Sequence, residues 1–94
     1  MHTITLDFSN CKYINDIHVV LKNTFEFPDY YGMNLDALWD CLKDYSSDYN
    51  HSFTIYLKGL STKSSELHDH MLQILELFTD LHNEKPDVIF RILS

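Results

Sequence analysis

Residues 27–42 (FPDYYGMNLDALWDCL) constrain the fold of this chain more than any other stretch. Phe27 precedes a proline, which pushes it out of the helical region and ends any helix before it. Gly32 supplies a permissive backbone in the loop, and Asn34 is a good N-terminal cap for a new helix. After this cap, apolar residues recur at helical spacing, so we expect one buried stripe made of Leu35, Leu38 and Leu42, flanked by Trp39 and Cys41.

The opposite face of this helix carries Asp36, Asp40 and Asp44 at positions i, i+4 and i+8, which we call the aspartate ridge. Like charges at this spacing destabilise a helix by roughly 0.2–0.5 kcal/mol per pair. Asp44 also lies toward the negative end of the helix dipole, and Lys43 offsets the charge only in part. Taken alone, such a ridge is more often a solvated helix face than a surface for a cationic partner.

Hydrophobic periodicity predicts the other elements. Residues 2–8 alternate between apolar and polar, as in a strand with one buried face. Asn15 is placed to cap the first helix. The predicted elements are a strand over 2–8, a helix over 16–25, a helix from Leu35, a loop over 46–52, a strand over 53–58, a connection over 59–65 with room for a helical turn at 60–63, a helix over 65–82 and a strand over 88–93.

The same pattern predicts which side chains are buried. The strand over 88–93 is apolar enough to be buried on both faces, apart from Arg91. We assign Tyr31 to packing and place Asp69, Gln73, Glu76 and Asp80 on the polar side of the last helix. The expected inward-facing residues are Ile4, Leu6, Phe8, Ile17, Val20, Leu21, Thr24, Phe25, Leu67, Met71, Ile74, Leu75, Phe78 and Leu81.

The order of these elements predicts the fold class. Strands separated by helical crossovers tend to pair in parallel, with right-handed connections. We therefore expect an α/β fold with a three-stranded parallel sheet and three to four helices packed on it. The 94 residues hold no internal repeat and no linker, so we expect a single domain over 1–94.

Charge and hydropathy exclude several classes of partner. The net charge is −7, from 14 acidic and 7 basic residues, which argues against direct nucleic-acid binding and favours a basic protein partner. No apolar run approaches the roughly 18–20 residues of a membrane span. Residues 1–10 lack the basic start and apolar core of a signal peptide, so we expect a cytoplasmic location.

The sequence gives little support for a catalytic site or a metal site. Cys11 and Cys41 fit no zinc or redox spacing, and we expect two thiols in a reducing compartment. Two histidines at i and i+2 in residues 68–70 point in different directions on a helix, which makes a poor chelate. The aspartate ridge offers no converging ligands, and no motif pairs Cys41 with a histidine as a nucleophile. We therefore expect no catalytic residue, no metal and no cofactor.

Residues 27–42 resemble the signature stretch of the barstar family, intracellular inhibitors of the secreted ribonuclease barnase. Weaker similarity covers residues 15–18, Asp80 and Glu84 on the last helix, and residues 92–94 at the end of the chain. The resemblance implies a barstar-like fold and a protein that is not an enzyme. It also implies a 1:1 complex with a basic secreted ribonuclease, whose active site is blocked by the second helix and the loop before it.

The resemblance also implies which residues touch the ribonuclease, with Asp40 in the place of a substrate phosphate. Residues 43–45, Lys-Asp-Tyr, depart from the threonine, glycine and tryptophan of the family pattern. An immunity protein for a different nuclease toxin, or an interaction module with another partner, is the alternative. The expected partner-binding residues are Tyr30, Gly32, Asn34, Leu35, Asp36, Ala37, Trp39, Asp40, Lys43, Asp44, Tyr45 and Asp80.

Overall fold

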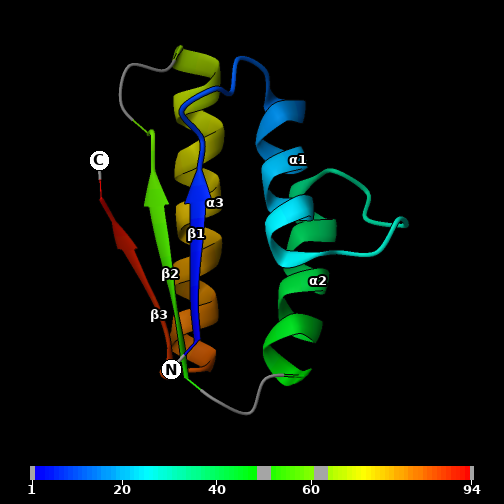
Figure 1. Ribbon diagram of the computed structural model, residues 1–94, viewed down its shortest axis with the longest axis vertical. Helices are drawn as coiled ribbons and strands as arrows, with labels where there is room; N and C mark the ends of the chain where they lie inside the picture. The colour runs from blue at the N-terminus through cyan, green and yellow to red at the C-terminus, as the bar shows by residue number, and fades with distance from the viewer. Residues whose placement is uncertain (1, 49–51, 61–63, 94) are drawn as a thin grey trace.

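The computed structural model describes residues 2–48, 52–60 and 64–93 and has an α/β fold (Figure 1). Its sheet contains three strands, all parallel, in the order β1-β2-β3. The three-stranded parallel sheet predicted from the sequence is confirmed, with three helices in the described residues. The elements in chain order are β1 (His2–Asp7), α1 (Ile14–Phe25), α2 (Leu35–Asp48), β2 (Phe53–Lys58), α3 (Ser65–Glu84) and β3 (Val88–Ile92).

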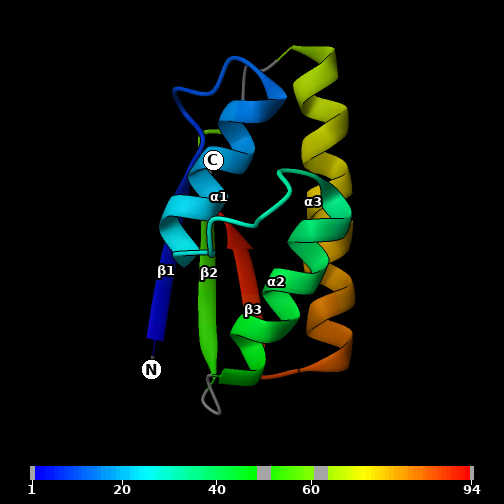
Figure 2. The ribbon, with the colours of Figure 1, turned by 90° about the vertical axis from the view of Figure 1, so that its right-hand side faces the viewer.

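The sheet and α3 form two layers, which are seen from the side in Figure 2, and α1 and α2 pack alongside them. Strand β2 is central and its residues Phe53, Ile55 and Leu57 are fully buried, as is typical of a strand inside a parallel sheet. Strand β1 alternates as predicted, with Ile4 and Leu6 buried and the residues between them exposed.

The prediction that the last strand is buried on both faces is wrong. Strand β3 lies at the edge of the sheet, and only Val88 in it is fully buried. Ile89 is 38% exposed and Ile92 is 53% exposed. The strand is apolar because one face packs toward α3, where the ring centres of Phe90 and Phe78 are 6.0 Å apart. An edge strand nevertheless keeps much of its other surface in solvent.

Helix α1 starts two residues earlier than predicted, and Asn15 is not its cap. The cap position belongs to Tyr13, and the carboxylate of Asp16 accepts hydrogen bonds from the backbone N–H groups of Lys12 and Tyr13, both at 3.0 Å. An acid at the third helical position can reach back in this way, which also suits the positive end of the helix. Within α1, Ile17, Leu21 and Phe25 are buried as predicted, while Val20 and Thr24 are only half-buried.

Helix α2 begins as predicted, because the side chain of Asn34 accepts a hydrogen bond from the backbone N–H of Ala37 at 2.8 Å. It continues to Asp48, past the predicted start of the loop at 46. The buried hydroxyl of Ser46 donates to the carbonyl of Lys43, so this serine is accommodated inside the helix. In the stripe, Leu38, Cys41 and Leu42 are buried, whereas Leu35 and Trp39 are half-buried.

Helix α3 matches its prediction closely and ends two residues later than expected. Ser64 caps it by accepting a hydrogen bond from the backbone N–H of Leu67. The predicted stripe is buried except for Leu75, which is half-buried. Most of the helical turn predicted at 60–63 (residues 61–63) and the middle of the loop predicted over 46–52 (residues 49–51) lie outside the described residues.

Gly59 fixes the approach of two chain segments at the end of the sheet. Its φ is +77°, and a Cβ atom at this position would collide with the backbone nitrogen of Ser9. Ser9 follows β1 and Gly59 follows β2, so the two parallel strands leave the sheet in contact. This glycine is required both by its conformation and by the close approach.

We expect Gly59→Ala to lower the free energy of unfolding by about 2 kcal/mol or more, because strain and a backbone clash add. Urea titration measures the loss. Gly32→Ala is the comparison variant, in which a smaller loss is expected: its φ is not positive, and its Cβ would meet only the side chain of Asn34, at 3.2 Å. An equal loss in the two variants would contradict the proposed role of Gly59.

Candidate functional site

A groove runs between α2 and α3, and we call it the α2–α3 groove. Two of its acids, Asp36 and Asp40, come from α2, and the other two, Glu76 and Asp80, come from α3. All four acids are exposed, and none of their carboxylates forms an ion pair or a hydrogen bond with another residue in the described part of the chain. The groove is lined by Leu35, Asp36, Trp39, Asp40, Gln73, Glu76, Leu77 and Asp80.

The structure brings together three acids that the sequence analysis had assigned to a partner surface, Asp36, Asp40 and Asp80. It adds Glu76 and Gln73, which had been placed only on the polar side of the last helix. The signal for Glu76 was present, because Glu76 and Asp80 are spaced i, i+4 and therefore share one face of α3. What the sequence could not supply was the side of α3 on which α2 packs.

Lys43 lies at the end of this groove and connects its two helices. Its Nζ is 3.4 Å from a carboxylate oxygen of Glu84 on α3, and it lies 5.5 Å from the ring centre of Trp39. A cation over an aromatic ring is attracted by the electrons of its face. The positive charge that departs from the family pattern is thus directed toward Glu84 and Trp39.

The loop before α2 presents one tyrosine and buries the next. Tyr30 is 78% exposed, whereas Tyr31 is buried against Phe27 with their ring centres 5.0 Å apart, which confirms its assignment to packing. The left-handed residue of this loop is Met33, with φ of 56°, and not Gly32. Gly32 instead leaves room for the side chain of Asn34, whose amide donates to the Gly32 carbonyl at 3.1 Å.

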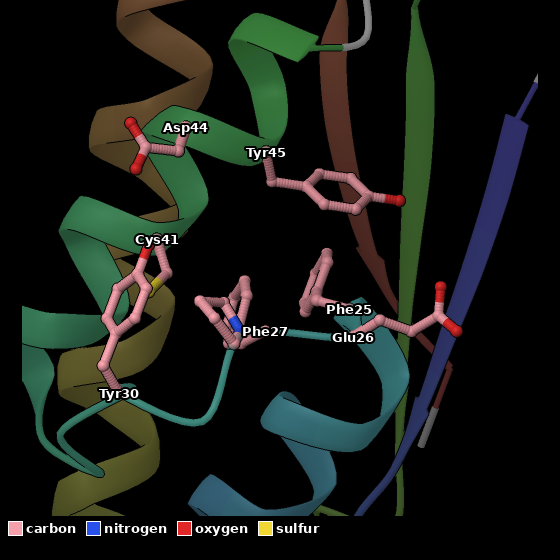
Figure 3. Close-up of a pocket in the computed structure, with 8 residues that line it drawn as sticks. Phe25, Glu26, Phe27, Tyr30, Cys41, Asp44 and Tyr45 are labelled. Carbon is pink, nitrogen blue, oxygen red and sulfur yellow. The ribbon is translucent and has the colours of Figure 1, made fainter.

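A second depression lies between this loop and α2, and we call it the loop–α2 pocket (Figure 3). It includes Tyr30, Asp44 and Tyr45, three of the predicted partner-binding residues, so the aspartate ridge does not face a single site. Asp36 and Asp40 line the α2–α3 groove, while Asp44 lines this pocket. The pocket is formed by Phe25, Glu26, Phe27, Pro28, Tyr30, Cys41, Asp44 and Tyr45.

Cys41 lies in this pocket as a buried thiol, and Cys11 is buried elsewhere in the core. Burial raises the pKa of the Cys41 thiol, and the nearby carboxylates of Asp44 and Asp40 raise it further. A thiol with a raised pKa is a poor nucleophile. The environment of Cys41 therefore suits packing and not covalent catalysis.

A buried histidine anchors the loop from behind, and sequence analysis missed it. The Nδ1 atom of His18 on α1 lies 2.6 Å from the Tyr31 hydroxyl, and its Nε2 atom lies 2.9 Å from Nε2 of His70 on α3. His18 is fully buried, and burial lowers its pKa to about 4, with the nearby His70 contributing. Burial also lowers the pKa of His70. Each hydrogen bond of this chain holds one proton, and the lowered pKa values of the two rings favour their neutral forms.

The arrangement of the described residues also bears on metal binding and on membrane insertion. Among the described residues, no three His, Cys, Asp or Glu side chains are placed to hold a metal ion together. His70 turns toward His18 and not toward His68, which is exposed. None of the helices, searched over the described ranges, has the length and apolar character needed to cross a membrane.

Comparison with known proteins covers nearly the whole chain. A family model described as "Barstar (barnase inhibitor)" matches residues 1–94. A Bacillus subtilis (strain 168) protein named "Putative ribonuclease inhibitor YrdF" is 34% identical over 87 residues, which are 93% of this chain and 92% of that protein. These similarities extend well beyond residues 27–42, so they concern the complete fold and not one motif.

The burial of His18, with a smaller contribution from His70, lowers its pKa and predicts a pH-dependent stability. His18 titrates near pH 6.5 when unfolded and near 4 when folded, so between these values the unfolded state binds more protons. The free energy of unfolding should therefore fall by about 2 kcal/mol from pH 7.5 to pH 5.0 on account of His18. Urea titration at the two pH values measures the fall.

Two variants isolate this contribution. His18→Gln should remove most of the fall, whereas His68→Gln, which changes an exposed histidine on α3, should leave it unchanged. Each variant lacks one histidine and both keep His70, so the difference between them compares loss of the buried His18 with loss of the exposed His68. A fall of equal size in His18→Gln would show that other groups cause it.

Proposed function

The chain belongs to the barstar family, and on this premise we propose that it inhibits a basic secreted ribonuclease of the barnase type by covering its active site. The name of the Bacillus subtilis relative supports a role as an inhibitor and not as an enzyme. The observation that carries the proposal is the α2–α3 groove, where four carboxylates converge without a cation from the described residues to neutralise them.

A ribonuclease active site complements these charges. It must hold the phosphates of RNA, so it is lined with Arg, Lys and His side chains. A carboxylate held rigidly at the position of a phosphate makes charge-assisted hydrogen bonds with such groups, often bidentate with arginine. We assign this role to Asp40, which lies in the middle of the aspartate ridge and lines the groove.

The other acids of the groove act around Asp40 in this proposal. Asp36 lies one turn earlier on the same helix and neutralises a neighbouring cation of the enzyme. Asp80 and Glu76 add contacts from α3, and Glu76 is a contact that the structure suggests and the resemblance did not. Because no residue has to move to bring these acids together, little ordering cost is expected on binding.

Aromatic side chains provide the apolar part of the surface. Tyr30 projects from the loop and is 78% exposed, and Trp39 forms part of the groove while half-buried. Rigid aromatic residues commonly supply most of the binding energy of protein interfaces. We propose that Gly32, Asn34, Leu35 and Ala37 complete the contact surface between them, in a 1:1 complex.

We also propose a cytoplasmic location, where the inhibitor would protect the cell that makes the ribonuclease. The two buried thiols, Cys11 and Cys41, are compatible with a reducing compartment.

A second candidate keeps the fold and changes the partner. Residues 43–45 depart from the family pattern, and Asp44 and Tyr45 line the loop–α2 pocket. This observation favours a different nuclease toxin, or a partner that is not a nuclease, over barnase itself. Co-purification with a basic nuclease, and titration against barnase and other small guanyl-preferring ribonucleases with residual cleavage as the readout, distinguish these candidates. Nuclease activity of the purified chain would contradict all of them.

Asp40→Ala should weaken inhibition by about 30-fold or more, which corresponds to a loss of about 2 kcal/mol, the usual threshold for a dominant interface residue. Its free energy of unfolding should change by less than about 0.5 kcal/mol, because Asp40 is exposed and unpaired among the described residues. The inhibition constant and a urea titration give the two values.

Asp87→Ala is the control for this experiment. It removes the same charge from an exposed position in the turn before β3, outside both depressions. Inhibition should stay within about twofold of the unmodified protein, as expected for a distant surface substitution. If Asp40→Ala inhibits as well as Asp87→Ala does, Asp40 is not the phosphate mimic.

The rate of association with the ribonuclease should fall as salt rises. The chain carries a net charge of −7, and its field attracts a basic enzyme over distances that salt shortens to about 10 Å at 0.1 M. Stopped-flow measurements from 0.02 to 0.5 M salt should show a decrease of about tenfold or more in the association rate. A rate independent of salt would remove electrostatic steering from the mechanism.

A further inference from the structure

We propose that the loop–α2 pocket is a separate cation subsite that binds one basic side chain of the protein partner, an arginine by preference. The identity of that partner rests on the proposed function, but the chemistry of the subsite follows from the pocket itself. The α2–α3 groove would bind the cationic residues with which the partner normally holds its substrate. This pocket would bind a cationic residue of the partner that lies outside its active site.

The shape and floor of the pocket suit a flat apolar group. It has a volume of about 410 Å³, within the range of roughly 300–1,000 Å³ that is usual for small-ligand sites. Beneath it lie the rings of Phe25 and Phe27, which are only 3% and 7% exposed and stack with their centres 5.2 Å apart. Tyr45 closes one side, and its ring meets the Phe25 ring edge-on with the ring centres 5.0 Å apart. These contacts fix the rings in place before any ligand binds.

The rim of the pocket is acidic on two sides. Figure 3 shows the carboxylates of Glu26 and Asp44 on opposite sides of the phenylalanine rings. Neither carboxylate has an ion-pair or hydrogen-bond partner among the residues that the structure describes. The nearby Lys22 is directed to Asp29 instead, at 3.5 Å. The pocket thus offers two acids to a cation from outside.

Backbone dipoles add to this negative field. Glu26 follows the last residue of α1, and Asp44 lies in the second half of α2, so both carboxylates are near the negative ends of helices. Such positions disfavour acids in the free protein. Glu26 also adopts the left-handed conformation, with φ of 57°, at a helix end where glycine is usual. Local backbone preferences therefore do not account for these two acids, whereas a bound cation would.

An arginine fits this combination better than a lysine. Its guanidinium group is planar, is less strongly hydrated than an ammonium group, and stacks on aromatic faces while its N–H groups reach carboxylates at its edges. Here the aromatic surface would be that of Tyr30 and Tyr45 above the buried rings of Phe25 and Phe27, and the carboxylates would be those of Glu26 and Asp44. Tyr30 lines the same pocket and is the exposed residue of the proposed inhibitory loop. A partner that covers Tyr30 is therefore positioned to place a side chain in the pocket.

The test uses the full chain, labelled with ¹⁵N, and two small probes. N-acetyl-L-arginine methylamide carries the guanidinium group, and N-acetyl-L-citrulline methylamide has nearly the same shape without the charge. The arginine probe should give saturable amide shifts at Glu26, Tyr30, Asp44 and Tyr45. The citrulline probe should bind at least about threefold more weakly, as expected when a charge-assisted contact is lost. Equal binding of the two probes, or no shifts at these residues, would overturn the proposal.

Two isosteric variants locate the charge. Asp44→Asn and Glu26→Gln should each raise the dissociation constant of the arginine probe at this pocket by about threefold or more. Shifts that the probe causes in the α2–α3 groove, at Asp36, Asp40 and Asp80, should stay the same. Asp87→Asn is the matched control and should change neither set. A pocket that binds equally well in Asp44→Asn and Asp87→Asn would refute the assignment.

This experiment is independent of the proposed function. The absence of ribonuclease inhibition would contradict the proposed function and leave the outcome of the probe titration intact. Failure of the titration, with inhibition retained, would contradict the cation subsite alone.

Discussion

The buried hydrogen-bonded chain from Tyr31 through His18 to His70 determines where the proposed inhibitory surface lies. It joins the loop before α2, helix α1 and helix α3 at a single point with no exposure to solvent at His18. Phe27 and Tyr31 pack beside it, so the loop is held from within while Tyr30 projects outward. Because α2 begins directly after this loop, the same contact helps to set the position of the aspartate ridge. A polar contact inside a core is costly when incomplete, and here both ring nitrogens of His18 have partners.

The acids of the α2–α3 groove, in contrast, have no ion-pair partner among the residues that the structure describes. Asp36, Asp40, Glu76 and Asp80 gather in one groove, and the described residues supply none of them with a cation. Each like-charge pair destabilises the free protein slightly, and the apolar packing of α2 and α3 below the groove offsets this cost. The arrangement is unfavourable for the chain alone and favourable beside a basic surface. That difference is the physical basis for reading the groove as a binding surface.

Much of the fold could be predicted from local patterns. The exceptions at the ends of α1 and α2 are local as well, whereas those in burial and in the site involve contacts over long distances in the chain. Strand β2 and helix α3 were predicted closely because period and caps are local signals. The exposure of β3 depends on its place at the sheet edge, and the pairing of His18 with His70 joins residues 52 positions apart. For the site, the resemblance indicated Asp36, Asp40 and Asp80. It could not indicate Glu76, nor the fact that Asp44 faces a different depression, because both depend on how α2 packs.

The aspartate ridge is therefore better understood as a boundary than as one binding site. On one side of it lies the α2–α3 groove, with an acidic lining suited to the cations that hold a substrate. On the other side lies the loop–α2 pocket, with an aromatic floor and its own two acids. Any enzyme that cleaves RNA must keep the first set of cations, since its chemistry needs them, whereas a cation outside the active site is free to vary between ribonucleases. Substitutions at Asp44 and Tyr45 would then alter the choice of partner while the groove that opposes catalysis stays unchanged.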